Sequence, residues 1–103
     1  MSVSTHVLDA TTGRPAVGVS VVLRGPRGLE LADRQTDVDG RVKDLAGTLA
    51  AGIYRLHFDT GAYFGQQTFY PEVSVAFTIT EPDGHYHVPL LLSPYAYSTY
   101  RGS

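Results

Sequence analysis

The sequence predicts an all-β sandwich, and three observations lead to that fold class. Short runs rich in Val, Thr, Tyr, Phe and Leu recur roughly every 8–12 residues, separated by clusters of Gly, Pro and Asp. Long stretches with the apolar spacing of an amphipathic helix are absent from the pattern. The 103 residues are 43% hydrophobic and 17% charged, a composition typical of one folded domain. We therefore expect a single domain over residues 1–103.

About eight strands are expected, and each is a run of β-branched or aromatic residues that ends at a turn signal. Residues 10–15 and 25–28 are interpreted as loops, and residues 60–67 as one helical turn or a loop. The predicted strands cover residues 3–9, 19–24, 29–36, 41–45, 54–59, 73–80, 85–92 and 95–101.

Two turns are specified by their own residues. Residues 81–84 read Glu-Pro-Asp-Gly, which is the clearest turn in the chain. Residues 37–40 read Asp-Val-Asp-Gly, and Gly40 is expected at a positive φ because glycine adopts that conformation without steric cost. Arg41 follows directly, so this turn is expected to hold a guanidinium at the start of a strand.

The strand at residues 85–92 has an unusual outer face. Successive side chains of a strand point to opposite faces, and a face that meets only water should be plainly polar. An outer face that is half apolar and half imidazole indicates a subunit contact with a site in it. The predicted core face holds Tyr86, Val88, Leu90 and Leu92, and the outer face holds His85, His87, Pro89 and Leu91.

The first and last strands add polar groups to the same outer face. In the first strand, alternation places His6 opposite the core face that carries Val3 and Val7. In the last strand, Ser98 and Tyr100 share one face, and we expect it to be the outer face.

Several classes of protein are excluded by composition. The chain has no cysteine, which excludes a disulfide scaffold, a thiolate zinc site and an iron–sulfur centre. The net charge is −2 without a basic stripe, so no nucleic-acid partner is expected. No apolar run approaches the length of a membrane span, and no signal peptide is visible, so we expect no membrane partner and a cytoplasmic location.

The candidate site groups each have an ordinary structural interpretation beside the functional one. A lone strand histidine such as His6 or His87 is more often a hydrogen-bonded surface residue than a general base. His85 and His87 share a face, but no cysteine or acidic ligand pattern accompanies them, so no metal site is predicted. Arg41 is either a solvated edge charge or a planar cation that binds an anionic or carbonyl-rich ligand. A nucleophilic-serine motif is absent from the sequence.

The last four residues, Tyr100, Arg101, Gly102 and Ser103, follow the last strand without a polar tail. Chain ends usually fray. The alternative is that a tyrosine, an arginine and a glycine placed directly after a strand are held at an interface, and the residues alone leave both interpretations open.

These motifs resemble the 5-hydroxyisourate hydrolases, the transthyretin-like enzymes of purine catabolism. The resemblance covers essentially the whole chain. It is carried by Thr-His-Val-Leu-Asp at residues 5–9, Asp-Gly-Arg at 39–41, His-Tyr-His-Val-Pro-Leu-Leu-Leu-Ser-Pro at 85–94 and Tyr-Arg-Gly-Ser at 100–103. Transthyretin itself shares the opening Val-Leu-Asp-Ala and the Leu-Leu-Ser-Pro-Tyr block, but lacks the histidine pattern and the final tetrapeptide.

The resemblance implies a transthyretin-like (prealbumin-like) sandwich of two four-stranded antiparallel sheets, with at most one short helix. It implies a homotetramer, a dimer of dimers, with the sites in a channel between the dimers. The implied reaction is hydrolysis of 5-hydroxyisourate to 2-oxo-4-hydroxy-4-carboxy-5-ureidoimidazoline, without metal or organic cofactor. The family's catalytic residues map onto His6, Arg41 and His87, and its substrate-binding residues onto Tyr100, Arg101, Gly102 and Ser103; the face pattern adds Ser98.

The chemistry of these groups suits hydrolysis of a ring amide. A neutral imidazole accepts a proton from water near pH 7, and we expect His6 to be that base, working with His87. A guanidinium such as Arg41 binds carbonyl oxygens through two contacts and stabilises a developing oxyanion.

Two other classes of function stay open. The same sandwich can serve as a non-catalytic small-ligand binding protein, since a fold alone does not specify function. Two histidines and an arginine suit a polar heterocycle, whereas a carrier of an apolar ligand would place other residues there. A structural β-sandwich is the second alternative.

Overall fold

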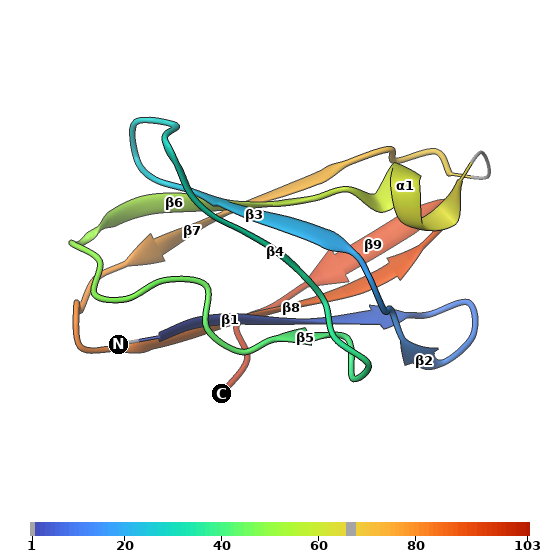
Figure 1. Cartoon of the computed structure of the whole chain (residues 1–103), viewed down its shortest axis with the longest axis horizontal. Helices are drawn as coiled ribbons and strands as arrows, with labels where there is room; N and C mark the ends of the chain where they lie inside the picture. Colours follow the sequence, from blue (N-terminus) through green and yellow to red (C-terminus); the bar gives the residue numbers. More distant parts are fainter. Residues whose placement is uncertain (1, 66–67) are drawn as a thin grey trace.

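A computed structural model of the chain describes residues 2–65 and 68–103. The described elements are nine strands and one short helix, arranged along the chain as drawn in Figure 1. They are β1 (Ser2–Asp9), β2 (Arg14–Pro15), β3 (Ser20–Arg24), β4 (Glu30–Gln35), β5 (Arg41–Val42), β6 (Gly52–Phe58), α1 (Thr60–Phe64), β7 (Val73–Ile79), β8 (His85–Ser93) and β9 (Ala96–Thr99).

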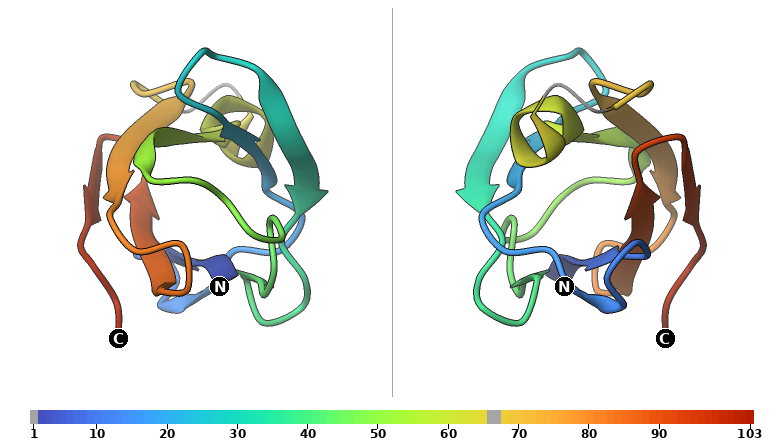
Figure 2. Two further views of the ribbon diagram at one scale, coloured as in Figure 1. Left: turned by 90° about the vertical axis from the view of Figure 1, so that its left-hand side faces the viewer. Right: turned by 90° about the vertical axis from the view of Figure 1, so that its right-hand side faces the viewer.

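Two sheets form the layers of the sandwich (Figure 2). The first has the order β2-β1-β8-β9, with β5 also paired to β1, and the second has the order β4-β3-β6-β7. The predicted fold class is therefore confirmed. One pairing differs from the expected antiparallel sheets: β1 and β8 run parallel to each other along the whole of β1. These strands come from opposite ends of the chain, so no tight hairpin forces them to be antiparallel.

The observed elements differ from the predicted ones mainly at the short strands and the helix. The predicted loop at residues 10–15 contains β2, whose Arg14 pairs with Asp9 of β1. Helix α1 confirms a helical turn after residue 60, and the Asp59 side chain caps it by accepting from the Ala62 N–H at 3.1 Å. Gln66 and Gln67, the end of that predicted segment, lie outside the described residues.

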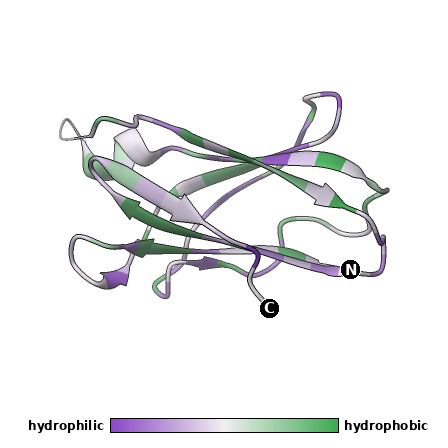
Figure 3. Cartoon of the chain, turned by 180° about the vertical axis from the view of Figure 1, so that it is seen from behind, coloured by the Kyte–Doolittle hydropathy of each residue, from purple (hydrophilic) through white to green (hydrophobic). Residues whose placement is uncertain are grey.

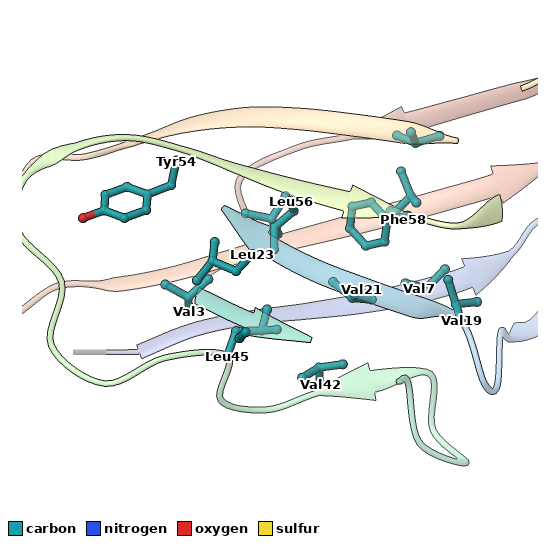
Figure 4. Packing of buried hydrophobic residues seen from close by; sticks show 14 of the residues in the cluster. Val3, Val7, Val19, Val21, Leu23, Val42, Leu45, Tyr54, Leu56 and Phe58 are labelled. Atoms are coloured by element: carbon teal, nitrogen blue, oxygen red, sulfur yellow. The ribbon is translucent and has the colours of Figure 1, made fainter. Parts of the chain in front are cut away.

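The core lies between the two sheets (Figure 4). Burial alternates residue by residue along β1, because only one face of that strand looks toward the second sheet. Each large apolar side chain removed from water contributes about 1.5–3 kcal/mol. The predicted core face of β8 is confirmed, with Tyr86, Val88, Leu90 and Leu92 each at most 7% exposed.

Hydrophobic and hydrophilic residues are interspersed along the strands of both sheets (Figure 3). This follows from a core on one face of each sheet and solvent on the other. Within residues 2–65 and 68–103, no helix combines the length and hydrophobicity that a membrane crossing requires.

Candidate active site

The outer face of the first sheet holds a polar pocket of about 190 Å³. Its lining comes from β1, β5 and the residue after it, β8 and the end of the chain, and it brings together one guanidinium, one ammonium and two imidazoles. A second and larger pocket, of about 250 Å³, lies between β7 and the last residues and is lined mainly by apolar groups. The chemistry-bearing side chains meet in the smaller one, which is the candidate active site. The polar pocket is lined by Ser4, Thr5, Arg41, Val42, Lys43, His85, His87 and Ser103.

Arg41 reaches the polar pocket because the preceding turn fixes its backbone. The Asp37 carboxylate accepts hydrogen bonds from the N–H groups of Asp39 at 2.9 Å and Arg41 at 3.0 Å. The bond from the Arg41 N–H is the largest cause that lowers the pKa of Asp37. The prediction for Gly40 is confirmed, since its φ is +73°. Its carbonyl accepts from the Val7 N–H of β1 at 2.7 Å, which ties the turn to the sheet.

His87 is held on two sides. In the parallel register of β1 and β8 it lies directly opposite Ser4, whose Oγ is 2.7 Å from His87 Nδ1. The Gly102 N–H donates to the His87 carbonyl at 2.9 Å. A Cβ at position 102 would overlap the His87 ring, so only glycine fits against that imidazole.

The surroundings of His87 favour its neutral form. Its side chain is half-buried, and this burial is the largest cause that lowers the pKa of His87 below its usual 6.5. The charge of Arg41 and repulsion from His6 and His85 lower the pKa of His87 further, while a hydrogen bond to the backbone of Ser4 opposes the shift. The imidazole is therefore neutral at pH 7 and able to accept a proton.

His6 lies next to the polar pocket rather than in its lining. It pairs with Arg41 across β1 and β5, so the two side chains share the outer face. His6 Nε2 is 2.8 Å from the carbonyl oxygen of Asp39. Since a carbonyl only accepts, Nε2 carries the proton and donates it to that bond. In the neutral ring this leaves Nδ1 as the free nitrogen of His6.

The last residues extend the sheet beyond β9. His87 and Gly102 form an antiparallel bridge three residues beyond the Leu90–Thr99 pair, which continues the register of β8 and β9. This register places alternate residues of the tail on opposite faces. The Arg101 guanidinium accordingly lies 5.0 Å from the centre of the Tyr86 ring and donates to the His85 carbonyl at 3.3 Å.

The predicted site residues therefore separate into three groups. Arg41, His87 and Ser103 line the polar pocket. His6 pairs with Arg41, and Gly102 lies against the His87 ring. Tyr100 and Arg101 line the larger pocket, whose lining also includes His87. Ser98 pairs with Leu91 on the outer face, outside the lining of the polar pocket.

Five lining residues were not predicted as site residues, and three of them, Ser4, Lys43 and His85, direct polar or charged side chains along the same face. Ser4 and His85 share the outer face with His6 and His87 by strand alternation, so the period-2 pattern could have found them. Lys43 follows Arg41 at the same alternate spacing. The strand predicted over residues 41–45 carries that signal, although β5 itself is only two residues long.

Fold and site together define a transthyretin-like β-sandwich whose outer sheet face carries imidazole and guanidinium groups. The family model described as the HIUase/Transthyretin family matches residues 3–102, and the chain belongs to that family. A 5-hydroxyisourate hydrolase from Salmonella typhimurium is 51% identical over an alignment that covers 97% of this chain and 79% of the relative.

Solved structures of both branches of the family match this fold. The 5-hydroxyisourate hydrolase of Klebsiella pneumoniae has a TM-score of 0.91 and 40% identity, covering 99% of this chain and 98% of that one. Sea bream transthyretin in complex with thyroxine has a TM-score of 0.88 and 33% identity, covering 99% and 95%. The resemblance seen in the sequence motifs is thus confirmed.

Proposed function

We propose that this chain hydrolyses 5-hydroxyisourate to 2-oxo-4-hydroxy-4-carboxy-5-ureidoimidazoline in urate degradation. The observation that carries the proposal is the polar pocket, in which Arg41 and a neutral His87 lie together on the outer sheet face. Relatives about half identical to this chain are named for that activity. The proposed chemistry uses water, imidazole and guanidinium, and assigns no step to a metal or an organic cofactor.

The reaction proceeds by addition of water to a ring amide carbonyl. A proton of the water passes to an imidazole as the water oxygen bonds to the carbonyl carbon, and the carbonyl oxygen becomes negative. Arg41 stabilises that oxyanion. The ring C–N bond then breaks, and the imidazolium returns its proton to the departing nitrogen, so the base is regenerated.

We assign the base to His87 rather than to His6, which the sequence analysis favoured. The Nε2 of His6 is engaged as a donor to the Asp39 carbonyl. His87 lines the polar pocket and has a lowered pKa, which keeps it neutral. His6 then serves beside Arg41, where its side chain orients the substrate.

The assembly and the remaining site residues belong to the same proposal. We propose that the chain is a single hydrolase domain over residues 1–103 and acts as a homotetramer, a dimer of dimers, in the cytoplasm. The outer face of the first sheet would line a channel between dimers. Within that channel, Tyr100, Gly102 and Ser103 would orient the substrate, Arg101 would hold the tail, and Ser98 would extend the same face.

The test is to generate 5-hydroxyisourate from urate in situ and to follow its absorbance decay with and without the protein. We expect decay well above the spontaneous rate. His87→Ala should lower it on the order of 10²-fold, the size of a lost general base, with the assembly unchanged by size-exclusion chromatography. Decay at the spontaneous rate in the unaltered protein would refute the proposal.

A carrier function is the second candidate, because sea bream transthyretin shares the fold and its structure contains thyroxine. The polar pocket is the feature that disfavours it for this chain. An apolar ligand would leave the charges of Arg41 and Lys43 without partners in a partly dehydrated site.

A further inference from the structure

Ser4 contacts the imidazole that we assign as the base, and no motif in the sequence marks it. It lies on β1 opposite His87 of β8, is half-buried, and lines the polar pocket. The parallel pairing of β1 and β8 fixes this opposition, so the contact is built into the sheet rather than into a loop.

We propose that Ser4 is a positioning residue for His87: its hydroxyl oxygen accepts the Nδ1–H, which leaves the Nε2 lone pair free to accept a proton in the polar pocket. The inference rests on the proposed function. It rests in addition on the 2.7 Å distance between Ser4 Oγ and His87 Nδ1.

The direction of this hydrogen bond decides whether His87 can be a base. A neutral imidazole carries one proton, on either Nδ1 or Nε2. If Nδ1 carries it, Nε2 accepts a proton from water, and the resulting imidazolium still donates from Nδ1 to the same oxygen. If the hydroxyl donated to Nδ1 instead, Nε2 would already carry the proton and the ring could not act as a base.

A neutral partner suits this site better than a carboxylate. A carboxylate at Nδ1 would stabilise the imidazolium and raise the pKa of His87. No carboxylate is among the causes of the shift: burial and the charge of Arg41 keep the pKa of His87 lowered. A hydroxyl therefore selects the protonated nitrogen without charging the ring.

Gly102 closes the other side of the ring. Its backbone lies against the imidazole so closely that a Cβ would overlap the ring. With Ser4 at Nδ1 and the tail against the ring edge, His87 is held in one orientation, which is the arrangement that general base catalysis requires.

Two substitutions of equal size separate a positioning role from a packing role. Ser4→Thr keeps the hydroxyl, whereas Ser4→Val replaces it with a methyl group on an otherwise equivalent β-branched side chain. We expect Ser4→Thr to retain kcat, and Ser4→Val to lose about tenfold in kcat with KM changed less than about twofold, the order expected for one neutral hydrogen bond.

Nitrogen-15 NMR of the imidazoles provides a readout that does not depend on activity. At pH 8 we expect the Nδ1–H form of His87 in the unaltered protein and in Ser4→Thr, and a shift toward Nε2–H in Ser4→Val. Ser2→Ala is the matched control, because Ser2 contacts His85 Nδ1 two residues earlier on the same face. It should alter the spectrum of His85 and leave His87 unchanged.

The outcomes distinguish this inference from the proposed function. The same tautomer of His87 in Ser4→Thr and Ser4→Val would overturn the positioning role, whether or not kcat falls. Equal kcat in the two variants would overturn it as well. An unaltered protein that fails to accelerate decay of 5-hydroxyisourate would refute the proposed function, while the tautomer measurement would still decide what Ser4 does.

Discussion

Gly102→Ala is expected to damage the active site while sparing the fold. A Cβ at this position would overlap the His87 ring and approach Pro89 Cγ at 3.2 Å, closer than ordinary van der Waals contact. The φ of Gly102 lies outside the left-handed region, so alanine would add no backbone strain. The clash is therefore relieved only if the tail or the imidazole moves, by about 1 Å. A misplacement of that size costs on the order of 10²-fold in rate.

The assay compares kcat/KM for 5-hydroxyisourate with the free energy of unfolding in urea. We expect Gly102→Ala to lose about 10²-fold in kcat/KM and less than about 1 kcal/mol of stability, since the tail lies at the surface of the sheet. Gly47→Ala is the control, because a Cβ there meets no atom within 4 Å and its φ is also outside the left-handed region. A Gly102→Ala enzyme as active as Gly47→Ala would refute the argument that the tail fixes His87.

Two further predictions concern charge and the turn before β5. The pKa of His87 is lowered from its usual 6.5, so the acid limb of kcat/KM, where the imidazole becomes protonated, should have its midpoint below pH 6.5. Arg41→Gln removes a positive charge that lowers the pKa of His87, so the acid limb of the pH–rate profile should move to higher pH. A limb that stays in place or moves to lower pH would contradict this prediction. Gly40→Ala should destabilise the fold by about 1–3 kcal/mol, as measured by urea unfolding. Alanine is strained at a φ of +73°, and its Cβ would overlap the Val7 carbonyl. An unchanged urea midpoint would show that the turn is not needed to hold β5.

The long strands could be predicted from the sequence because their burial follows a period of two. In β8 this alternation separated Tyr86 from His87 correctly, and in β1 it placed His6 on the outer face. The two-residue strand β2 could not be predicted, since two residues carry no period, and β5 covers only Arg41–Val42 of the strand predicted over residues 41–45. The parallel pairing of β1 and β8 was also beyond reach, because it joins segments more than 80 residues apart and leaves no local signal.

The candidate site was predictable as a set of side chains but not as a geometry. Alternation and family motifs indicated His87 and Arg41, which line one pocket. The placement of Arg101 over Tyr86 and of Gly102 against His87 depends on the register of the tail with β8, which the bridge between His87 and Gly102 fixes. A one-residue shift in that register would exchange the faces of the tail, and no residue preference in the tetrapeptide specifies it.

The sandwich by itself does not separate an enzyme from a carrier, because the chain matches the Klebsiella hydrolase and sea bream transthyretin with similar TM-scores of 0.91 and 0.88. The outer face of the first sheet makes the distinction. A base must be neutral and oriented, and His87 has a lowered pKa and contacts on two sides. An apolar ligand needs neither property, and burying Arg41 and Lys43 beneath it would carry a desolvation cost. The same residues that make this face a poor apolar binding site therefore suit the binding and hydrolysis of an oxygen-rich ring.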